Sequence, residues 1–278
     1  MAGGADVSET RFTPSGVRLT RRVERPGALN WLFLPGGPGI GSESLYELAD
    51  GLDVPGSIWM VDLPGDGSNV APVGAPDDPY SLWPGVLAEA ARALSNPVYV
   101  GHSTGGMYLL STPELEGLLK GLVLISSAPD AGWRERFGAM TLSHPLPAVE
   151  AATAAYEAER SNERLRDLAV ASAEWNFAAG LVEVGRELLA RMPYNGPAVD
   201  WSDANFDDTY AAAWWPQTLP TLIISGEDDR IVWQSAWDAP RFQGANVMRR
   251  TIAGGAHFPW IERPGAVRDA FAAFASRL

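Results

Sequence analysis

The sequence predicts an α/β fold in which helices cover both faces of a mostly parallel central sheet. Three observations predict it: short apolar runs recur along the chain, stretches with helical spacing separate them, and turns containing Gly or Asp follow several of the runs. Apolar runs of four to six residues are typical of strands that are buried on both faces. Their alternation with helices indicates a parallel sheet.

The expected elements follow in chain order from these patterns. Residues 17–25 are predicted to form an early strand. The other predicted strands are residues 29–34, 57–61, 97–100, 121–125, 221–224 and 247–252, most of them apolar runs bounded by turn residues. Each predicted helix has apolar residues at helical spacing; the helices are residues 44–52, 82–94, 107–110 and 264–278. The second of these is rich in alanine, the strongest helix former.

The stretch from 132 to 216 interrupts this rhythm. It contains no convincing buried strand and is rich in Ala, Glu, Arg and Trp at helical spacing, as in 151–168 and 181–189. We therefore expect a core domain made of residues 1–131 and 217–278. Residues 132–216 are expected to form a helical cap, or lid, over the carboxyl edge of the sheet.

Composition excludes several classes of function. The chain has 278 residues and a net charge of -13, which argues against nucleic acid or an anionic membrane as a partner. It has no cysteine and three histidines, so we expect no disulfide, no metal site and no cofactor. The sequence MAGGADVSETRF at the start lacks the apolar core of a signal peptide, and no run reaches membrane-spanning length. The expectation is a cytoplasmic protein that acts on a small molecule, with its oligomeric state left open.

The most informative motif is Gly101-His102-Ser103-Thr104-Gly105, a G-x-S-x-G sequence. It directly follows a predicted strand and precedes a run that can start a helix. A serine on such a sharp turn needs small neighbours, because the backbones pass closely. The turn exposes the hydroxyl at the edge of the sheet, so Ser103 is the predicted nucleophile.

A serine nucleophile needs a base, which is most often histidine. His102 directly precedes Ser103, so its side chain leaves the turn in another direction, and His144 lies in the expected lid. His257 lies in the loop after the last predicted strand. Parallel strands end at one edge of a sheet, so this loop and the serine turn share that edge. His257 is the predicted base.

The acid that orients the base should follow another strand at the same edge. Asp228 and Asp229 both follow strand 221–224, in the chain order serine, acid, histidine. We favour Asp229, with Asp228 as the second candidate. Asp130, which follows strand 121–125, is the third.

An acyl-transfer site also needs two hydrogen-bond donors for the oxyanion. One is expected to be the N–H of Thr104, the residue after the nucleophile. The other should come from the turn Pro35–Gly39, which we call the oxyanion turn. Its two prolines have no N–H, which leaves Gly36, Gly37 or Gly39, and Gly37 is central.

The same glycine-rich turn also fits a competing interpretation, a dinucleotide-binding unit with Asp62 at the ribose. However, the run from Gly37 reads G-P-G-I-G-S, so Ser42 stands where the third glycine of the fingerprint belongs. Pro38 also removes an N–H from a loop that would have to bind pyrophosphate. A hydrolase is therefore favoured over a dinucleotide-binding protein.

Taken together, these motifs resemble those of serine hydrolases of the alpha/beta-hydrolase fold, and more narrowly of their proline iminopeptidase-related branch. The matching sequences are P-G-G-P-G, G-H-S-T-G-G, G-E-D-D and G-A-H-F-P-W-I-E. The resemblance covers residues 31–278 outside the cap and implies Gly37 as the second oxyanion donor. Pro35 replaces the histidine that the branch usually has before Gly-Gly-Pro-Gly, so one loop hydrogen bond of that branch is missing.

The resemblance leaves the substrate open. The cap lacks a clear match to the acidic and tryptophan pattern by which iminopeptidases hold a free amine; Glu174–Trp175 is the nearest similarity, and further acidic candidates are Asp200, Asp203, Asp207 and Asp208. Tryptophans suggest an apolar pocket, and those expected to line it are Trp133, Trp175, Trp214, Trp215 and Trp233. An ester, lactone or thioester with an apolar group fits best. The alternatives are an aminopeptidase, a C–C bond hydrolase and a non-catalytic small-molecule binding protein.

Overall fold

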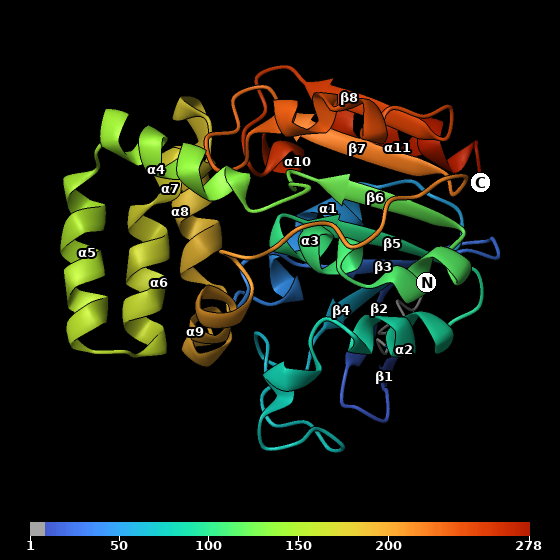
Figure 1. Ribbon diagram of the computed structural model, residues 1–278, viewed down its shortest axis with the longest axis horizontal. Coiled ribbons are helices and arrows are strands. Elements are labelled where there is room, and N and C mark those ends of the chain that lie inside the picture. The colour runs from blue at the N-terminus through green and yellow to red at the C-terminus, as the bar shows by residue number, and fades with distance from the viewer. Residues whose placement is uncertain (1–8) are drawn as a thin grey trace, which may run out of the picture.

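A sheet of eight strands forms the centre of the molecule in the computed structural model, which describes residues 9–278 (Figure 1). Across the sheet the order is β1-β2-β4-β3-β5-β6-β7-β8. The strands are β1 (Thr10–Phe12), β2 (Arg18–Glu24), β3 (Asn30–Leu34), β4 (Ser57–Asp62), β5 (Pro97–His102), β6 (Gly121–Ile125), β7 (Thr221–Gly226) and β8 (Val247–Ile252). Strand β2 pairs antiparallel with β1 and β4, and all other pairs are parallel. The predicted α/β class with a mostly parallel sheet is confirmed. The prediction that the first residues are not a signal peptide falls mainly on residues 1–8, which lie outside the described residues.

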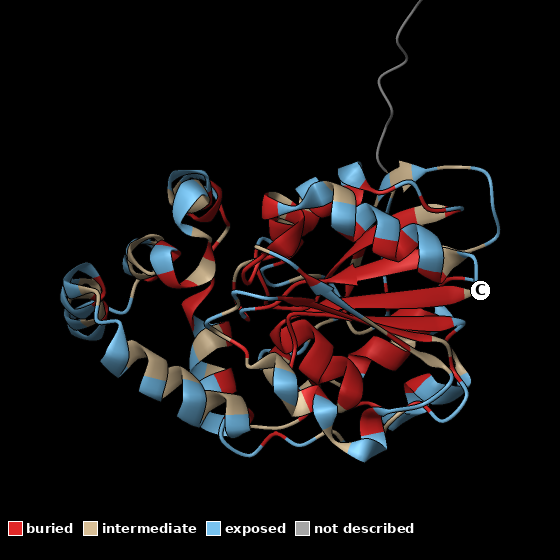
Figure 2. Cartoon of the chain, turned by 90° about the horizontal axis from the view of Figure 1, so that it is seen from above, coloured by how far each residue is buried: buried red, intermediate tan, exposed pale blue. Residues whose placement is uncertain are grey.

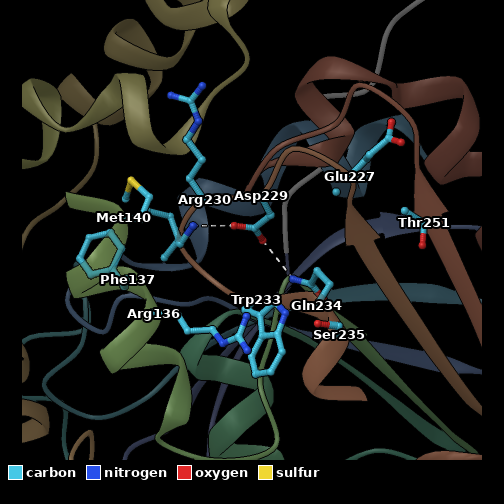
Figure 3. Close-up of a pocket in the computed structure, with 12 residues that line it drawn as sticks. Arg136, Phe137, Met140, Glu227, Asp229, Arg230, Trp233, Gln234, Ser235 and Thr251 are labelled. Carbon is cyan, nitrogen blue, oxygen red and sulfur yellow. Dashed lines mark hydrogen bonds between the residues drawn. The ribbon is translucent and has the colours of Figure 1, made fainter. Parts of the chain in front are cut away.

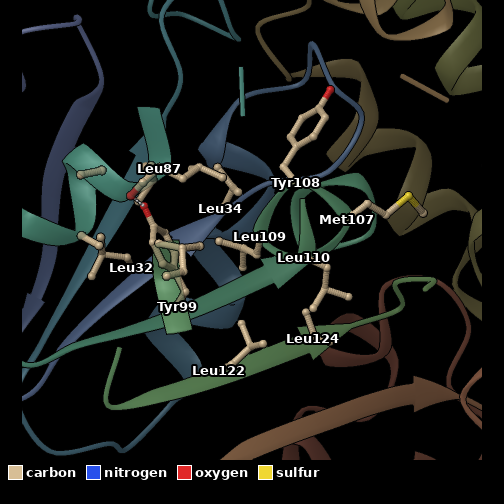
Figure 4. Packing of buried hydrophobic residues seen from close by; sticks show 14 of the residues in the cluster. Leu32, Leu34, Leu87, Tyr99, Met107, Tyr108, Leu109, Leu110, Leu122 and Leu124 are labelled. Atoms are coloured by element: carbon tan, nitrogen blue, oxygen red, sulfur yellow. Dashed lines mark hydrogen bonds between the residues drawn. The ribbon is translucent and has the colours of Figure 1, made fainter. Parts of the chain in front are cut away.

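Helices cover both faces of the sheet, because each central strand is apolar on both sides. Trp31 and Phe33 of β3 face α1 (Tyr46–Gly51), α10 (Pro259–Glu262) and α11 (Pro264–Ala275). Leu32 and Leu34 face the opposite side, with α2 (Val86–Arg92) and α3 (Thr104–Leu110). Figure 4 shows this second cluster, in which the Tyr99 hydroxyl donates to the carbonyl of Leu87 at 3.0 Å. Single 3₁₀ turns complete the core at Ser42–Leu45, Pro79–Leu82, Pro113–Gly117, Gln234–Asp238 and Pro240–Phe242.

Six helices lie between β6 and β7 and pack beside the carboxyl edge of the sheet (Figure 1). We call them the inserted helices: α4 (Gly132–Ser143), α5 (Pro147–Ala158), α6 (Asn162–Ala171), α7 (Ala173–Asn176), α8 (Val182–Ala190) and α9 (Gly196–Asn205), with a 3₁₀ turn at Ala179–Leu181. After them the chain returns to the core, where the Tyr210 hydroxyl donates to Ala128 and the Trp214 indole donates to Leu109.

Several element boundaries differ from those that the sequence predicts. The expected helix 82–94 begins only at Val86, because Pro84 holds Trp83 in an extended conformation. The helical run 151–168 is broken at Glu159–Ser161, where the Ser161 side chain caps α6 by accepting from the N–H of Arg164. Helix α3 starts at Thr104, earlier than the apolar run from Met107 indicates, and the last helix, α11, ends at Ala275. Strand β1 was not predicted, since its three exposed residues have no apolar pattern.

Candidate active site

The strand register brings the predicted catalytic loops to one edge of the sheet. Leu34 pairs with Gly101, His102 with Ile125, and Ile125 with Ile224. Gly226 then pairs with Ile252 at the end of β8. The oxyanion turn, Ser103, and the loops with Asp229 and His257 therefore all leave the sheet on the same side.

Ser103 occupies a strained turn between β5 and α3. Its φ of 50° and ψ of -124° lie in a region that residues with side chains rarely adopt. The turn closes because Gly101 and Gly106 touch: a Cβ on Gly101 would lie 2.6 Å from the backbone of Gly106. A Cβ on Gly36 would lie 2.6 Å from the Cβ of Ser103. The glycines around Ser103 are thus required by close approach, as the motif predicted.

His257 and Asp229 form a buried pair. The Nδ1 of His257 lies 3.1 Å from each carboxylate oxygen of Asp229, and the two side chains are 5% and 0% exposed. Asp229 also accepts from the N–H groups of Ile231 and Val232 and from the Gln234 amide, at 2.9 to 3.1 Å. A carboxylate only accepts hydrogen bonds, so Nδ1 carries the proton and Nε2 has the free lone pair that a base needs. Within residues 9–278 no hydrogen bond joins Nε2 to the Ser103 hydroxyl; such bonds are commonly long before substrate binds.

The other acidic candidates lie differently. Asp228 is exposed, and its backbone N–H donates to Gly255. Asp130 accepts from the N–H of Gly132 just as α4 begins. The structure therefore brings Asp229, and neither Asp228 nor Asp130, together with His257.

His102 packs against His257 and hydrogen-bonds to its backbone. Its Nε2 lies 3.0 Å from the carbonyl oxygen of His257, and its ring packs against the rings of His257 and Trp260 with centroids 4.9 and 4.8 Å apart. A carbonyl accepts, so Nε2 carries the proton. Burial, with His257 nearby, holds the pKa of His102 well below its usual value, so the ring stays neutral. His144 is exposed beside Ser143 at the end of α4.

Two free backbone donors lie at this edge, one in the oxyanion turn and one directly after Ser103. Among residues 9–278 neither the N–H of Gly37 nor that of Thr104 donates a hydrogen bond, and Gly37 is exposed whereas Gly36 is buried. The N–H of Gly39 is excluded, because it donates to Asp66 at 2.8 Å. The Thr104 hydroxyl donates to the carbonyl of Gly37 at 3.1 Å and ties the turn to α3.

Two buried carboxyl groups that hold these loops received no role from the sequence. Asp66 binds the oxyanion turn, and Glu262 accepts from the N–H of Ala256, next to the base, and from that of Ala178 in the inserted segment. Burial raises the pKa of Glu262. A signal for Asp66 exists in the sequence, since it stands between two glycines directly after a buried strand. Asp62, the ribose ligand of the dinucleotide interpretation, instead accepts from Ser42 and pairs with Arg18.

A cavity of about 460 Å³ lies between α4 and the loop after β7 (Figure 3). Arg136, Phe137 and Met140 line it from α4, and Asp229 and Trp233 from the loop. The Arg136 guanidinium lies over the Trp233 ring. Of the predicted pocket tryptophans, Trp233 thus lines a cavity.

The other four tryptophans fall into two groups. Trp133 and Trp175 flank Phe137, with ring centroids 6.3 and 5.7 Å from it, and form an aromatic row on α4 and α7. Trp214 and Trp215 belong to the core: the Trp214 indole donates to Leu109, and Trp215 packs on Trp237 and Phe242. Both therefore pack beside the sheet, and neither is among the residues that line the cavity between α4 and the loop after β7.

The five acidic candidates for holding a free amine are each paired with an arginine. Glu174 pairs with Arg186 at 3.0 Å, and Asp200 with Arg160 at 2.6 Å. Asp203, Asp207 and Asp208 all lie within 3.5 Å of Arg134. Within residues 9–278, no group of three or more His, Asp or Glu side chains is placed to hold a metal ion, and no helix is long and apolar enough to cross a membrane.

Comparison with known proteins agrees with this architecture. Residues 31–270 match the model of a family described as the alpha/beta hydrolase family. The pimeloyl-(acyl-carrier protein) methyl ester esterases of Xanthomonas oryzae and Xanthomonas campestris are each 27% identical to the chain. The matches cover 78% and 80% of this chain and 83% and 85% of those proteins.

Two solved structures share the fold over nearly the whole chain. The proline iminopeptidase-related protein from Thermus thermophilus has a TM-score of 0.70 at 21% identity, covering 98% of this chain and 99% of that one. An esterase from Rhodococcus sp. has a TM-score of 0.67 at 20% identity, with the same coverage.

Proposed function

The chain belongs to the alpha/beta hydrolase family, and from this premise we propose that it is a serine hydrolase of small or medium carboxylic esters, lactones or thioesters with an apolar group. The observation that supports this most is the shared edge of the sheet, where Ser103 stands on its strained turn and His257 pairs with Asp229. The three residue types at these positions are those of a Ser-His-Asp triad in the chain order of this fold.

In the proposed mechanism Ser103 attacks the substrate carbonyl while Nε2 of His257 takes the hydroxyl proton. Asp229 holds the Nδ1 proton, fixes the ring orientation and stabilises the imidazolium. The N–H groups of Gly37 and Thr104 bind the oxyanion of the tetrahedral intermediate. His257 then returns the proton to the leaving group, and water hydrolyses the acyl-enzyme by the same steps in reverse.

The inserted segment supports an apolar substrate. We propose that residues 132–216 act as the cap, with core residues 1–131 and 217–278 beneath it. The segment carries the aromatic row Trp133, Phe137 and Trp175. It also places Phe177 against Phe258, the residue after His257, with ring centroids 4.8 Å apart. The named Xanthomonas relatives are pimeloyl-(acyl-carrier protein) methyl ester esterases, which supports an ester as the substrate class.

An aminopeptidase is less well supported. A free amine needs an unpaired carboxylate, and each acidic candidate, including Glu174, has an arginine partner. The triad alone does not distinguish ester hydrolysis from C–C bond cleavage, so a substrate panel has to include both.

Labelling with a fluorophosphonate probe, followed by mass spectrometry, tests the proposal. We expect modification at Ser103 and no modification in Ser103→Ala, which should keep the fold and lose turnover by about a million-fold. Modification at another residue would contradict the assignment of Ser103. No labelling of folded wild-type protein would favour the binding-protein alternative.

A panel of p-nitrophenyl esters of increasing chain length, with proline p-nitroanilide and a vinylogous diketone, then tests the substrate class. We expect the esters to be turned over fastest. Faster release from the proline amide would identify an aminopeptidase, and faster cleavage of the diketone a C–C hydrolase.

A further inference from the structure

The oxyanion turn is held at its far end by a single carboxyl group. The Oδ1 of Asp66, in the loop after β4, accepts from the N–H of Gly39 and from that of Gly67, each at 2.8 Å. The carbonyl of Gly39 accepts from the N–H of Asn195, also at 2.8 Å. Gly39 is therefore fixed on both sides, two residues from the free N–H of Gly37.

No positively charged group pairs with the carboxylate of Asp66 among the described residues. Asp66 is 2% exposed and has no ion-pair partner among residues 9–278. Arg18 is directed to Asp62 at 2.9 Å and to Glu43 at 3.9 Å. The ionisable groups that influence Asp66 most, Asp62 and Glu43, are themselves acidic.

Burial therefore favours the neutral form of Asp66. Burial first, and then the negative charge of Asp62, raise the pKa of Asp66 to about 7, while the hydrogen bonds from Gly39 and Gly67 act in the opposite direction. The hydroxyls of Tyr80 and Tyr108 are the other titratable groups that Asp66 influences, and burial raises the pKa of both. Near neutral pH the turn is thus held by a mixture of charged and neutral Asp66.

We propose that Asp66 is a positioning residue whose negative charge holds the oxyanion turn in its reactive form, so that protonation of Asp66 lowers the reactivity of Ser103. A charged acceptor makes a hydrogen bond roughly twice as strong as a neutral one. Protonation weakens the hold on Gly39 and lets the N–H of Gly37 move away from the oxyanion. The inference rests on the proposed function, because it concerns how the same site is regulated.

Asp66→Asn tests it. The amide keeps the accepting Oδ1 and never ionises, and its nitrogen replaces Oδ2, which makes no hydrogen bond within residues 9–278. The rate of Ser103 modification by a fluorophosphonate is measured for wild type and variant between about pH 5 and pH 9, a range that includes the raised pKa of Asp66. Both proteins are measured with the same probe under the same conditions, so any pH dependence that they share cancels in the ratio of the two rates.

We expect the wild-type to variant ratio to be near one at the acidic end and to rise to about tenfold at the basic end. The midpoint of this rise should lie near the raised pKa of Asp66, about 7. Asp207→Asn is the matched control: burial raises the pKa of Asp207 too, yet its carboxyl binds Ser202 and not the oxyanion turn, so its ratio should stay flat. A flat ratio for Asp66→Asn would assign Asp66 a purely structural role, and a ratio that falls with pH would mean that its charge opposes the oxyanion; either overturns the proposal.

Failure of the proposed function gives a different result. If wild type is not labelled at all, the serine hydrolase proposal fails and the effect on reactivity fails with it, whereas labelling with a flat ratio overturns the Asp66 proposal alone. Denaturant unfolding at about pH 5 and pH 8 checks the charge independently of catalysis. A carboxyl group whose pKa is raised in the folded protein stabilises the fold at low pH, and this stabilisation is lost as the pH rises through the raised pKa. The free energy of unfolding of wild type should therefore fall between these two pH values relative to that of Asp66→Asn. An equal change in both proteins would show that Asp66 does not ionise in this range and would overturn the proposal.

Discussion

The catalytic edge of the sheet and the inserted helices are built in opposite ways. Every residue of β5, β6 and β7 is buried, and the loops after β3 and β8 at the same edge are held by hydrogen bonds to the carboxyl groups of Asp66 and Glu262. Helix α4 contains no buried residue, α5 buries two and α6 buries one. Figure 2 shows the contrast as a buried sheet beside helices whose surfaces are mostly half-buried or exposed.

This difference separates two tasks. Atoms that must meet within a few tenths of an ångström lie on rigid elements, which is what proton transfer and oxyanion binding require. Residues that would contact a substrate's apolar group lie on helices with few buried contacts, which open at low cost in free energy. The first region should therefore be intolerant of small changes and the second tolerant.

Replacing each of two neighbouring aspartates by asparagine should give the largest difference in activity. Asp229→Asn replaces a group that only accepts with one that also donates, so His257 loses its orienting partner and turnover should fall by about ten-thousand-fold. Asp228→Asn, one residue earlier and exposed, should leave kcat/KM unchanged. Steady-state kinetics on an ester substrate measure both. Equal losses would mean that both carboxylates serve the base.

The same Gly-to-Ala substitution in each region should change the stability in opposite directions. Gly101→Ala places a Cβ 2.6 Å from the backbone of Gly106, so it should destabilise the fold by about 3 kcal/mol. Gly138→Ala, in α4, meets no atom within 4 Å and should stabilise the helix by up to about 1 kcal/mol. Denaturant unfolding gives both values. A loss for Gly138→Ala would show that α4 packs more tightly than its exposure indicates.

Glu262 lies at the boundary and joins the two regions. Glu262→Gln leaves one accepting oxygen for the N–H groups of Ala178 and Ala256, so one of them loses its partner, at a cost of about 2 kcal/mol. Since Ala256 precedes the base, labelling of Ser103 should also slow. The exposed Glu187→Gln on α8 should change neither. Slower labelling with unchanged stability would assign Glu262 to positioning alone.

The smallest effect is expected on the outer surface of the inserted helices. Arg134 pairs with Asp203, Asp207 and Asp208, and its side chain is 36% exposed, so Arg134→Ala should cost about 1 kcal/mol or less. High salt should reduce that cost, because it screens exposed pairs. Thermal unfolding at low and high salt measures it. A loss of several kcal/mol would show that this cluster is a structural part of the fold.

Local sequence patterns were enough to predict the fold and the residues gathered at its edge. The apolar runs located seven of the eight strands, and only β1, with no apolar residue facing the core, escaped. The G-x-S-x-G motif predicts Ser103, and the common edge of parallel strands predicts His257 and Asp229; their catalytic roles remain predictions. The helix boundaries at Val86 and Ser161 depended on one proline and one capping serine, which periodicity does not weigh.

The sequence alone predicts the order of strands and turns along the chain, and with it the set of side chains that can reach the carboxyl edge of the sheet. The tertiary structure alone pairs Asp229 rather than Asp228 with His257, packs Trp214 against Leu109, and brings Asp66 to Gly39 across 27 positions of the chain. The physical reason is the range of the interactions. Periodicity and turn chemistry act over a few residues, whereas a hydrogen bond depends on tenths of an ångström that packing of distant segments sets.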